Sequence, residues 1–141
     1  MNFFSKDKKS AFEAKEAAQW IAFGPVIFQA ARVLRNSGIL KLIEDSGKTG
    51  LTNEEIAEKL KLSNYGVRVL LESGLGLGLV LVNDKKYTLG KTGYFILHDS
   101  LTITNMDFVH DVNYKGLFYL DESIEKGKAE GLKEFGDWPT I

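Results

Sequence analysis

The stretch from Leu51 to Leu89 constrains the fold most, because it carries the start signals of two consecutive helices. Thr52 is followed three residues later by Glu55, which is the capping-box pattern that begins a helix. Ser63 is a suitable N-cap for a second helix, from residue 64 to about residue 73. Gly74 is expected to end that helix, because glycine adopts the left-handed conformation without steric cost. We therefore predict two short helices joined by a tight turn.

A β-hairpin is predicted directly after these helices. Leu79–Val82 and Lys86–Leu89 are rich in β-prone residues, and the segment Asn83-Asp84-Lys85 between them is typical of a turn. Helix, turn, helix and hairpin in this order make a winged helix. The predicted fold class is therefore mainly α. It is a winged helix-turn-helix with a small β-hairpin wing, at about residues 39–97, with further helices before and after it.

The charges of a winged helix indicate whether DNA is its partner. A DNA reader presents base- and phosphate-binding side chains on its second helix, and here that helix holds one fixed positive charge, Arg68. Five acids and five bases balance between residues 52 and 90: Glu54, Glu55, Glu58, Glu72 and Asp84 against Lys59, Lys61, Arg68, Lys85 and Lys86. Phosphate binding needs a basic face, so we expect no nucleic-acid partner. A winged-helix DNA-binding transcription regulator, touching DNA through its wing, stays the alternative.

The composition argues against several classes of site. Among 141 residues, 18 basic and 19 acidic side chains nearly balance, which gives no reason to expect a polyanionic partner. The chain has no cysteine, so it has neither a disulfide framework nor a thiolate metal site. Its two histidines, His98 and His110, are too far apart in sequence to bind one metal ion from a single helical turn. We expect a cytoplasmic protein without a metal site.

The N-terminal third is predicted to form two apolar helices. Apolar residues recur nearly all round the helical pattern between Ala17 and Leu34, and Pro25 is expected to end or kink the first helix and to begin the second. The polar residues Gln19 and Gln29 flank this break, and a membrane span needs about twenty largely unbroken apolar residues. We therefore expect no membrane segment here.

Helices that are apolar on all sides must be covered on several sides, and a small winged helix covers only one of them. The cover is either a second copy of the chain or the C-terminal helices of the same chain, and the pattern leaves both open. Five aromatic residues are the candidates for a dimer interface or for the wall of a substrate pocket: Trp20, Phe23, Phe28, Phe108 and Tyr114. Core or interface packing is the preferred interpretation over a ligand pocket.

No catalytic or cofactor-binding residue is predicted. The glycine-rich segment Gly74–Gly78 resembles a cofactor loop, but a helix precedes it and a hairpin follows, which is the reverse of the order such a loop needs. Asp99, His110 and Asp111 could form a histidine–carboxylate contact, but no strained elbow motif frames a nearby serine as nucleophile. A histidine on an aromatic helix is more often a packing residue, and we interpret His110 in that way.

Three segments, in this order, resemble a known family. The first runs from Phe28 to Leu40, and the second is the winged helix ending in Lys86-Tyr87-Thr88-Leu89-Gly90-Lys91-Thr92-Gly93. The third is Leu120-Asp121-Glu122-Ser123-Ile124-Glu125-Lys126-Gly127-Lys128, followed by Phe135-Gly136 and Trp138. Together, from about residue 17 to residue 141, they resemble the N-terminal domain of class I S-adenosylmethionine-dependent O-methyltransferases. These are the plant-like and polyketide-type enzymes that act on small molecules.

The resemblance implies a dimerisation and substrate-lid domain rather than a DNA reader. It implies a homodimer in which the N-terminal helices interlock with the partner subunit, and a small-molecule methyl acceptor. In the family, a Rossmann-like domain follows and holds S-adenosylmethionine and the catalytic base. That domain is absent from this sequence, whose end at Trp138-Pro139-Thr140-Ile141 is interpreted as a cut. We therefore expect a fragment that is inactive and binds no cofactor by itself, with residues 1–16 as a flexible arm and helix start and residues 17–141 as the dimerisation domain.

Two departures from the family pattern concern the third segment. Lys128 and Ala129 follow Gly127, where the family often has a proline shortly after the glycine. Leu117-Phe118-Tyr119 precedes Leu120, where plant members carry a tryptophan. The second departure leaves the class of methyl acceptor open.

Overall fold

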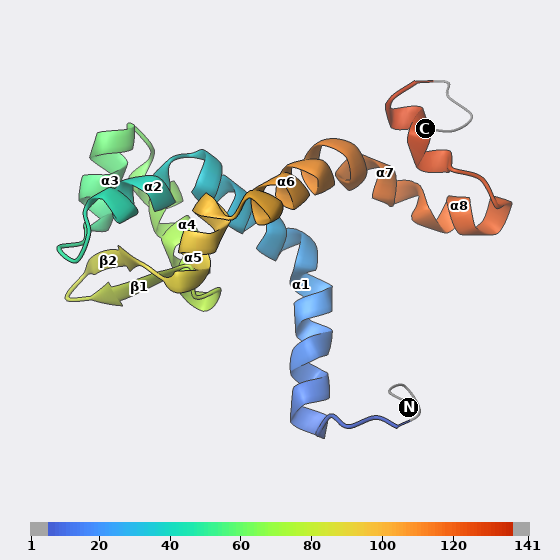
Figure 1. Ribbon diagram of the computed structural model, residues 1–141, viewed down its shortest axis with the longest axis horizontal. Coiled ribbons are helices and arrows are strands. Elements are labelled where there is room, and N and C mark those ends of the chain that lie inside the picture. Colours follow the sequence, from blue (N-terminus) through green and yellow to red (C-terminus); the bar gives the residue numbers. More distant parts are fainter. Residues whose placement is uncertain (1–5, 137–141) are drawn as a thin grey trace. The chain divides into compact units, whose positions relative to one another are not determined.

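The computed structural model of the chain describes residues 6–136 (Figure 1). The predictions that concern Trp138 and the end of the chain fall outside these residues. The chain divides into two compact units, Met1–Gly93 and Tyr94–Ile141, which we call the N-terminal unit and the C-terminal unit and describe separately. No helix within the described residues is long and apolar enough to span a bilayer.

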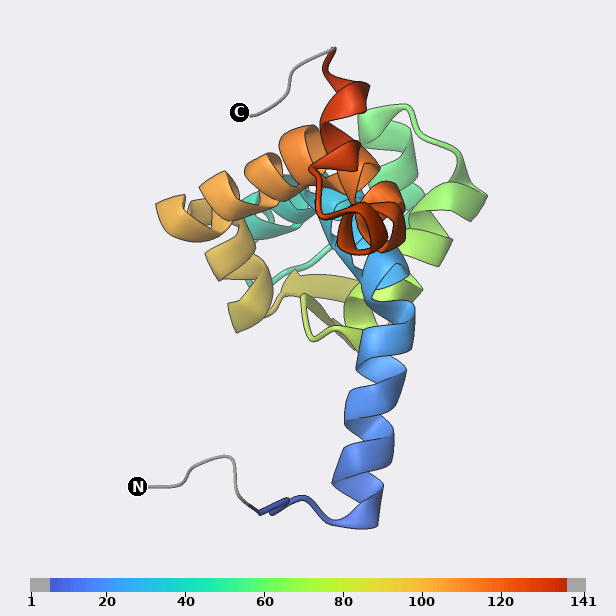
Figure 2. The same ribbon diagram turned by 90° about the vertical axis from the view of Figure 1, so that its right-hand side faces the viewer.

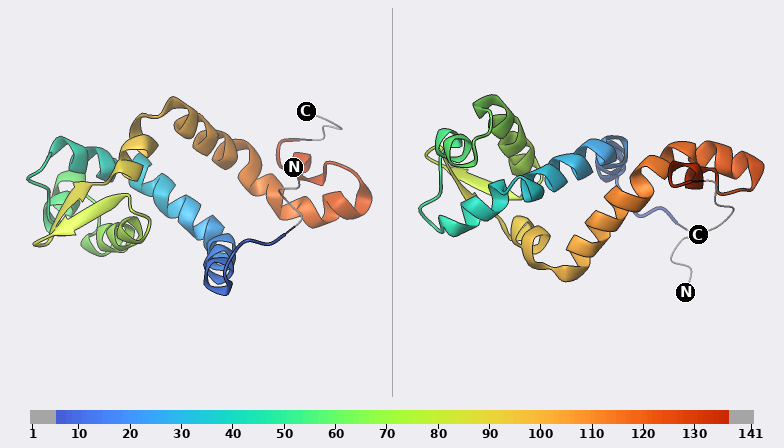
Figure 3. Two further views of the ribbon diagram at one scale, coloured as in Figure 1. Left: turned by 60° about the horizontal axis from the view of Figure 1, so that its bottom comes forward. Right: turned by 90° about the horizontal axis from the view of Figure 1, so that it is seen from above.

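The N-terminal unit begins with one long helix, α1 (Ala11–Asn36). Its start is fixed by a capping box, in which the Ser10 side chain accepts from the Glu13 backbone N–H and the Ser10 backbone N–H donates to Glu13 at 2.7 Å. Pro25 lies inside the helix, so the predicted kink is present (Figure 1), but the two predicted helices form one continuous helix. Proline removes one hydrogen-bond donor from a helix and the turns on both sides keep theirs, so the chain bends instead of stopping. The ribbon of α1 changes direction midway along its length (Figures 1 and 3).

Three shorter helices follow, α2 (Ile39–Asp45), α3 (Asn53–Leu60) and α4 (Asn64–Gly76). The predicted caps are confirmed. The Thr52 backbone N–H donates to the Glu55 carboxylate at 2.8 Å, and the Gly66 backbone N–H donates to the Ser63 hydroxyl at 2.9 Å.

The prediction that α4 ends at Gly74 is wrong, because the helix continues to Gly76. Gly74 is buried where α4 packs on α1, and a Cβ atom there would lie 3.2 Å from side-chain atoms of both Leu34 and Val80. Its lack of a side chain therefore permits close packing. The left-handed residue after the helix is Gly78, with φ of +66°.

The predicted hairpin is present as β1 (Val80–Asn83) and β2 (Lys86–Leu89), paired antiparallel with Val80 opposite Leu89. Asp84 and Lys85 have φ values of 47° and 63°, as a two-residue hairpin turn of type I′ requires. On the outer side of β2, Tyr87 forms an isolated bridge with Leu51. The hairpin is therefore joined to the segment that leads into α3.

The core of the N-terminal unit takes at least one side chain from each of α1, α2, α3, α4 and the start of the hairpin. The fully buried side chains are Leu34, Ile39, Leu40, Ile43, Ile56, Val67, Leu71, Leu79 and Val80. In α2 and α4 these residues recur at helical spacing, so each of these two helices has one apolar face that packs inward. The predicted fold class, a mainly helical winged helix with a small β-hairpin, is confirmed.

The C-terminal unit is a series of helical segments. α5 (Lys91–His98) leads into it, and α6 (Ser100–Phe108) is capped by Asp99. A π-helical turn (Val109–Asn113), α7 (Tyr114–Gly116), a 3₁₀ turn (Leu117–Tyr119), α8 (Leu120–Lys126) and a second 3₁₀ turn (Glu130–Glu134) follow.

This unit folds back on itself where α7 meets the last 3₁₀ turn. A Cβ atom on Gly131 would lie 2.6 Å from the Gly116 carbonyl oxygen, so the two backbones are in direct contact. The Tyr119 hydroxyl donates to Glu134 at 2.8 Å, and this hydrogen bond raises the pKa of Tyr119. Leu132 is the only buried residue among the described residues of the unit. Its own core is therefore very small.

Candidate functional site

An apolar groove lies on the surface of the N-terminal unit, between α1 and the C-terminal end of α4. Its volume is about 610 Å³, within the range of natural binding pockets. It is lined by Phe12, Lys15, Glu16, Gln19, Trp20, Phe23, Val26, Ile27 and Ala30 of α1, by Ser73 and Gly76 of α4, and by Leu77 directly after it. We call this set the apolar groove.

Six of the twelve groove-lining residues belong to the half of α1 that extends away from the winged helix, residues 11–23, which we call the projecting half (Figures 1 and 2). The buried residues of α1, Ala31 and Leu34, both lie beyond it, where α1 packs on α4. Phe12 is 77% exposed, Trp20 48% and Phe23 56%. Large apolar side chains that are this exposed and this close together are typical of an interaction surface.

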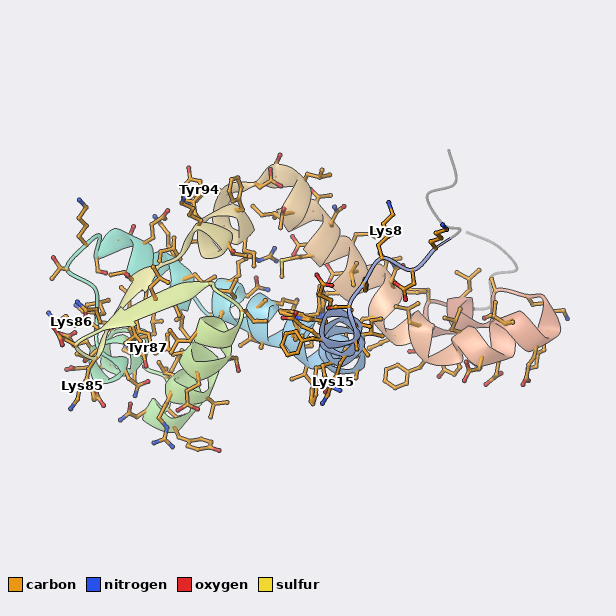
Figure 4. The ribbon with its side chains drawn as sticks, turned by 90° about the horizontal axis from the view of Figure 1, so that it is seen from below. Lys8, Lys15, Lys85, Lys86, Tyr87 and Tyr94 are labelled. Carbon is orange, nitrogen blue, oxygen red and sulfur yellow. The ribbon has the colours of Figure 1, made fainter. Side chains whose placement is uncertain are left out.

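The spacing along α1 explains why these side chains share one face. Phe12, Glu16, Gln19, Trp20, Phe23, Val26, Ile27 and Ala30 recur at intervals of one, three or four residues, which places them side by side on a helix. Lys15 and Glu16 add charges of both signs at the groove, and Lys15 lies on the projecting half (Figure 4). The groove is therefore apolar with a polar edge and no excess of one charge.

The capping box keeps the first turn of the projecting half helical. The Ser10 backbone N–H and hydroxyl both donate to the Glu13 carboxylate, and these hydrogen bonds lower the pKa of Glu13. The carboxylate is also close to the positive end of the helix dipole, which favours its charged form. The first turn is thus held in place at neutral pH.

The structure brings together two of the five candidate aromatics. Trp20 and Phe23 both line the apolar groove, whereas Phe28 is half-buried and is not part of its lining. Five residues separate Phe28 from Phe23, which turns it about 140° around the helix. Phe108, 53% exposed at the end of α6, and Tyr114 belong to the C-terminal unit. The role of all five in an interface or a pocket wall stays a prediction.

Ten of the groove-lining residues were not among the five candidate aromatics, and the large apolar ones of these ten are Phe12, Val26, Ile27 and Leu77. The first three were within reach, because they continue the helical spacing of Trp20 and Phe23 through the proline. Leu77 was not, because α4 was expected to end at Gly74, two residues before its real end at Gly76.

The histidine–carboxylate contact considered from the sequence is not formed by Asp99. Its carboxylate accepts hydrogen bonds from the Thr102 hydroxyl at 2.7 Å and the Thr102 backbone N–H at 2.8 Å, and these lower the pKa of Asp99. His110 and Asp111 lie beyond the opposite end of α6, about 16 Å along the helix axis from Asp99. Asp99 is a helix cap. Within residues 6–136, no group of three or more His, Cys, Asp or Glu side chains could hold a metal ion.

The single fixed positive charge on the second helix of the winged helix, Arg68, contacts side chains of its own helix. Arg68 is 3.9 Å from the Glu72 carboxylate, and its guanidinium lies 5.5 Å from the centre of the Tyr65 ring. The arginine charge is therefore shared with a carboxylate and an aromatic ring. Lys85 and Lys86 are at the tip of the hairpin (Figure 4).

Comparison with known families identifies the domain. The model of the Dimerisation2-like domain family matches residues 15–87, from the projecting half of α1 to the second strand of the hairpin. The chain belongs to the Dimerisation2-like domain family. The matched region includes the whole apolar groove except Phe12. No curated protein sequence matches the chain.

Solved structures extend the similarity of this Dimerisation2-like domain. The S-adenosylmethionine-dependent methyltransferase SibL in its apo form is 26% identical with a TM-score of 0.74, over 86% of this chain and 36% of that one. Human N-acetylserotonin methyltransferase in complex with SAM is 19% identical with a TM-score of 0.69, over 96% of this chain and 39% of that one. PigF with SAH is 19% identical with a TM-score of 0.69, over 87% of this chain and 37% of that one. At this identity, the last two show a shared fold.

The resemblance to the N-terminal domain of S-adenosylmethionine-dependent O-methyltransferases, expected from the sequence, is confirmed. The chain spans little more than a third of the length of the structures it matches.

Proposed function

We propose that this Dimerisation2-like domain joins two copies of an S-adenosylmethionine-dependent O-methyltransferase and forms part of the lid over its small-molecule substrate. The observation that carries the proposal is the apolar groove on the projecting half of α1, with Trp20 and Phe23 at its surface. Membership of a dimerisation-domain family supports a second copy as the occupant. The cysteine-free composition suits a cytoplasmic enzyme.

The exposed side chains of the groove are sufficient to contribute strongly to association. Full burial of one such side chain stabilises by about 1.5–3 kcal/mol, and a two-fold dimer counts each residue twice. Phe12, Trp20, Phe23 and Val26 are each about half exposed or more. Burying the exposed part of all four in both copies therefore contributes about 6–12 kcal/mol. This is comparable with the cost of association, about 4–15 kcal/mol, so the surrounding contacts set the final affinity.

The lid part of the proposal rests on the resemblance to these methyltransferases and on the apolar groove. S-adenosylmethionine binding needs a strand, a glycine-rich loop and a helix in that order, whereas Gly74 and Gly76 lie in α4 and β1 follows the Gly74–Gly78 segment. We therefore place methyl transfer and cofactor binding in the catalytic domain of the whole enzyme and expect this chain by itself to be inactive. The domain contributes apolar walls and subunit contacts.

Trp20 provides a direct optical test of the proposed interface. The chain has two tryptophans, so Trp138→Phe leaves Trp20 as the sole source of tryptophan emission. Because Trp20 is 48% exposed in a single chain and buried in the proposed dimer, its emission is expected to shift to longer wavelength on dilution. An emission maximum typical of an exposed indole, unchanged at all protein concentrations, would contradict the proposal.

The domain is expected to bind no S-adenosylmethionine. Isothermal titration calorimetry with millimolar cofactor should give only the heat of dilution. A saturable heat with one site per chain would show that the domain holds a cofactor site of its own, and the assignment of cofactor binding to the rest of the enzyme would be wrong.

A further inference from the structure

The middle of α1 contains two adjacent residues that each weaken a helix. Pro25 cannot donate the hydrogen bond that a helix directs to the Ile21 carbonyl, and its ring crowds that carbonyl. Gly24, directly before it, has the greatest backbone freedom of any residue type. These two residues fall where the projecting half meets the half of α1 that packs on α4.

No neighbouring segment requires a glycine at position 24. A Cβ atom there would meet nothing within 4 Å outside its own helix and its chain neighbours, and the φ of Gly24 is not in the left-handed region. Gly74 is different, because its Cβ would lie 3.2 Å from Leu34. The reason for Gly24 is local, because in a helix the Cβ atom of a residue directly before a proline crowds the proline ring, and glycine has no Cβ. Gly24 therefore combines with Pro25 to leave this point of α1 with more backbone freedom than the rest of the helix.

The apolar groove extends across this point. Phe12, Trp20 and Phe23 lie on one side of Gly24-Pro25, and Val26, Ile27 and Ala30 on the other. The second wall of the groove is Ser73, Gly76 and Leu77, which belong to α4 and its end and are fixed to the core through Leu71 and Gly74. Rotation at residues 24 and 25 would therefore move Trp20 and Phe23 relative to Leu77, and would change the width of the groove.

We infer that Gly24-Pro25 is a hinge that lets the projecting half of α1 close the apolar groove on a second copy of the chain. The identity of the occupant rests on the proposed function, whereas the hinge rests on the backbone of α1. A hinge is made of a few residues that absorb a change of backbone angle, and a proline is the commonest site of a sharp bend within a helix. In a free chain the projecting half samples several orientations, and in the dimer it holds one. A straight, stiff α1 would present Trp20 and Phe23 at the wrong angle.

The absence of cysteine allows clean spin labelling. Ala18→Cys on the projecting half and Glu58→Cys on α3 are exposed and outside the groove. Pulsed electron–electron double resonance measures the distance between the two spin labels. Dilution of the labelled chains with excess unlabelled protein ensures that this distance lies within one chain. The test variant is Gly24→Ala with Pro25→Ala, which restores a regular helix. The matched control is Val69→Ala, a helix-favouring change at an exposed residue of α4 that is not part of the groove lining.

The hinge predicts a broad distance distribution in dilute wild type that narrows when the protein associates. The double variant should give a narrow distance distribution at every protein concentration. Its dimer dissociation constant should be about tenfold or more above that of wild type. The Val69→Ala control should match wild type in both readouts. Circular dichroism should show that both variants keep their helices, since alanine favours a helix more than glycine, proline or valine does.

Three results separate the hinge from the dimer. If the distance distribution of dilute wild type is as narrow as that of the double variant, the hinge is wrong and the proposed dimer is unaffected. A double variant that dimerises within about twofold of wild type overturns the coupling of hinge to association. If the wild type never associates, but the double variant has a narrower distance distribution than wild type, the result supports the hinge and overturns the proposed dimer.

Discussion

Replacing Leu71 by alanine is expected to lower the free energy of unfolding of the N-terminal unit by about 2–5 kcal/mol. Leu71 is fully buried on α4, in a core shared with Leu34 of α1 and Ile56 of α3. Alanine would leave a cavity among these side chains and lose their contacts. Since small domains have about 5–15 kcal/mol of stability, this one change removes a large share of the total. Urea titration followed by circular dichroism measures it.

Val69→Ala is the matched control for the core substitution. Val69 lies on the same helix, two residues away, and is 40% exposed, so truncating it should change stability by about 0.5 kcal/mol or less. Both variants and wild type are compared at one protein concentration, because association adds to apparent stability. Equal losses for Leu71→Ala and Val69→Ala would contradict the assignment of Leu71 to the core.

Replacing Phe23 by aspartate is expected to raise the dimer dissociation constant by about a hundredfold or more. The change removes an aromatic anchor from the apolar groove, which loses about 1.5–3 kcal/mol of burial. It also places an unpaired carboxylate where the second copy would pack, and desolvating that charge costs several kcal/mol more. Phe23 is 56% exposed in the single chain, so folding itself should change little. Sedimentation velocity and urea titration measure the two effects separately.

Leu81→Asp is the control for the introduced charge. Leu81 is an apolar residue of β1 with a similar exposure of 59%, and it is not part of the groove lining. Its replacement should leave association unchanged. If Phe23→Asp unfolds the domain, Phe23 is part of the intrachain core and its place in the interface is wrong. If both variants dissociate equally, net charge rather than the groove controls association.

The parts of the fold that the sequence predicted well depend on short-range chemistry. The capping box of Thr52 and Glu55 and the N-cap at Ser63 each need only residues within three positions, and both are present as expected. The hairpin turn at Asp84 and Lys85 likewise depends on the turn residues themselves. Because these signals are local, they survive whatever the rest of the chain does.

One error arose where packing between distant segments overrides a local signal. The local sequence predicts that the helix ends at Gly74, but Gly74 packs against Leu34, forty residues earlier, and lies inside α4. The error at Pro25 has a local cause instead, because a proline removes only one hydrogen-bond donor and α1 continues through it. Helix propensities give the free-energy cost of a residue type within a helix, and tertiary contacts can outweigh that cost.

The candidate site was predicted only in part, because one of its walls follows from local periodicity and the other depends on packing between helices. Trp20 and Phe23 share a helical face, and their spacing alone places them together. Phe28 belongs to the same apolar stretch but points about 140° away from Phe23, which a count of aromatics does not reveal. The α4 side of the groove, with Leu77, could not be found from periodicity, because it depends on how α1 crosses α4.

Sedimentation of the wild-type chain tests the dimerisation domain most directly. One chain has a mass of 15.7 kDa, and from low to high micromolar concentration the weight-average mass is expected to rise toward twice that value and then stay there. A plateau at two copies is the result for a closed two-fold interface on α1. A chain that sediments as a monomer throughout this range, with its helices intact, would contradict the account.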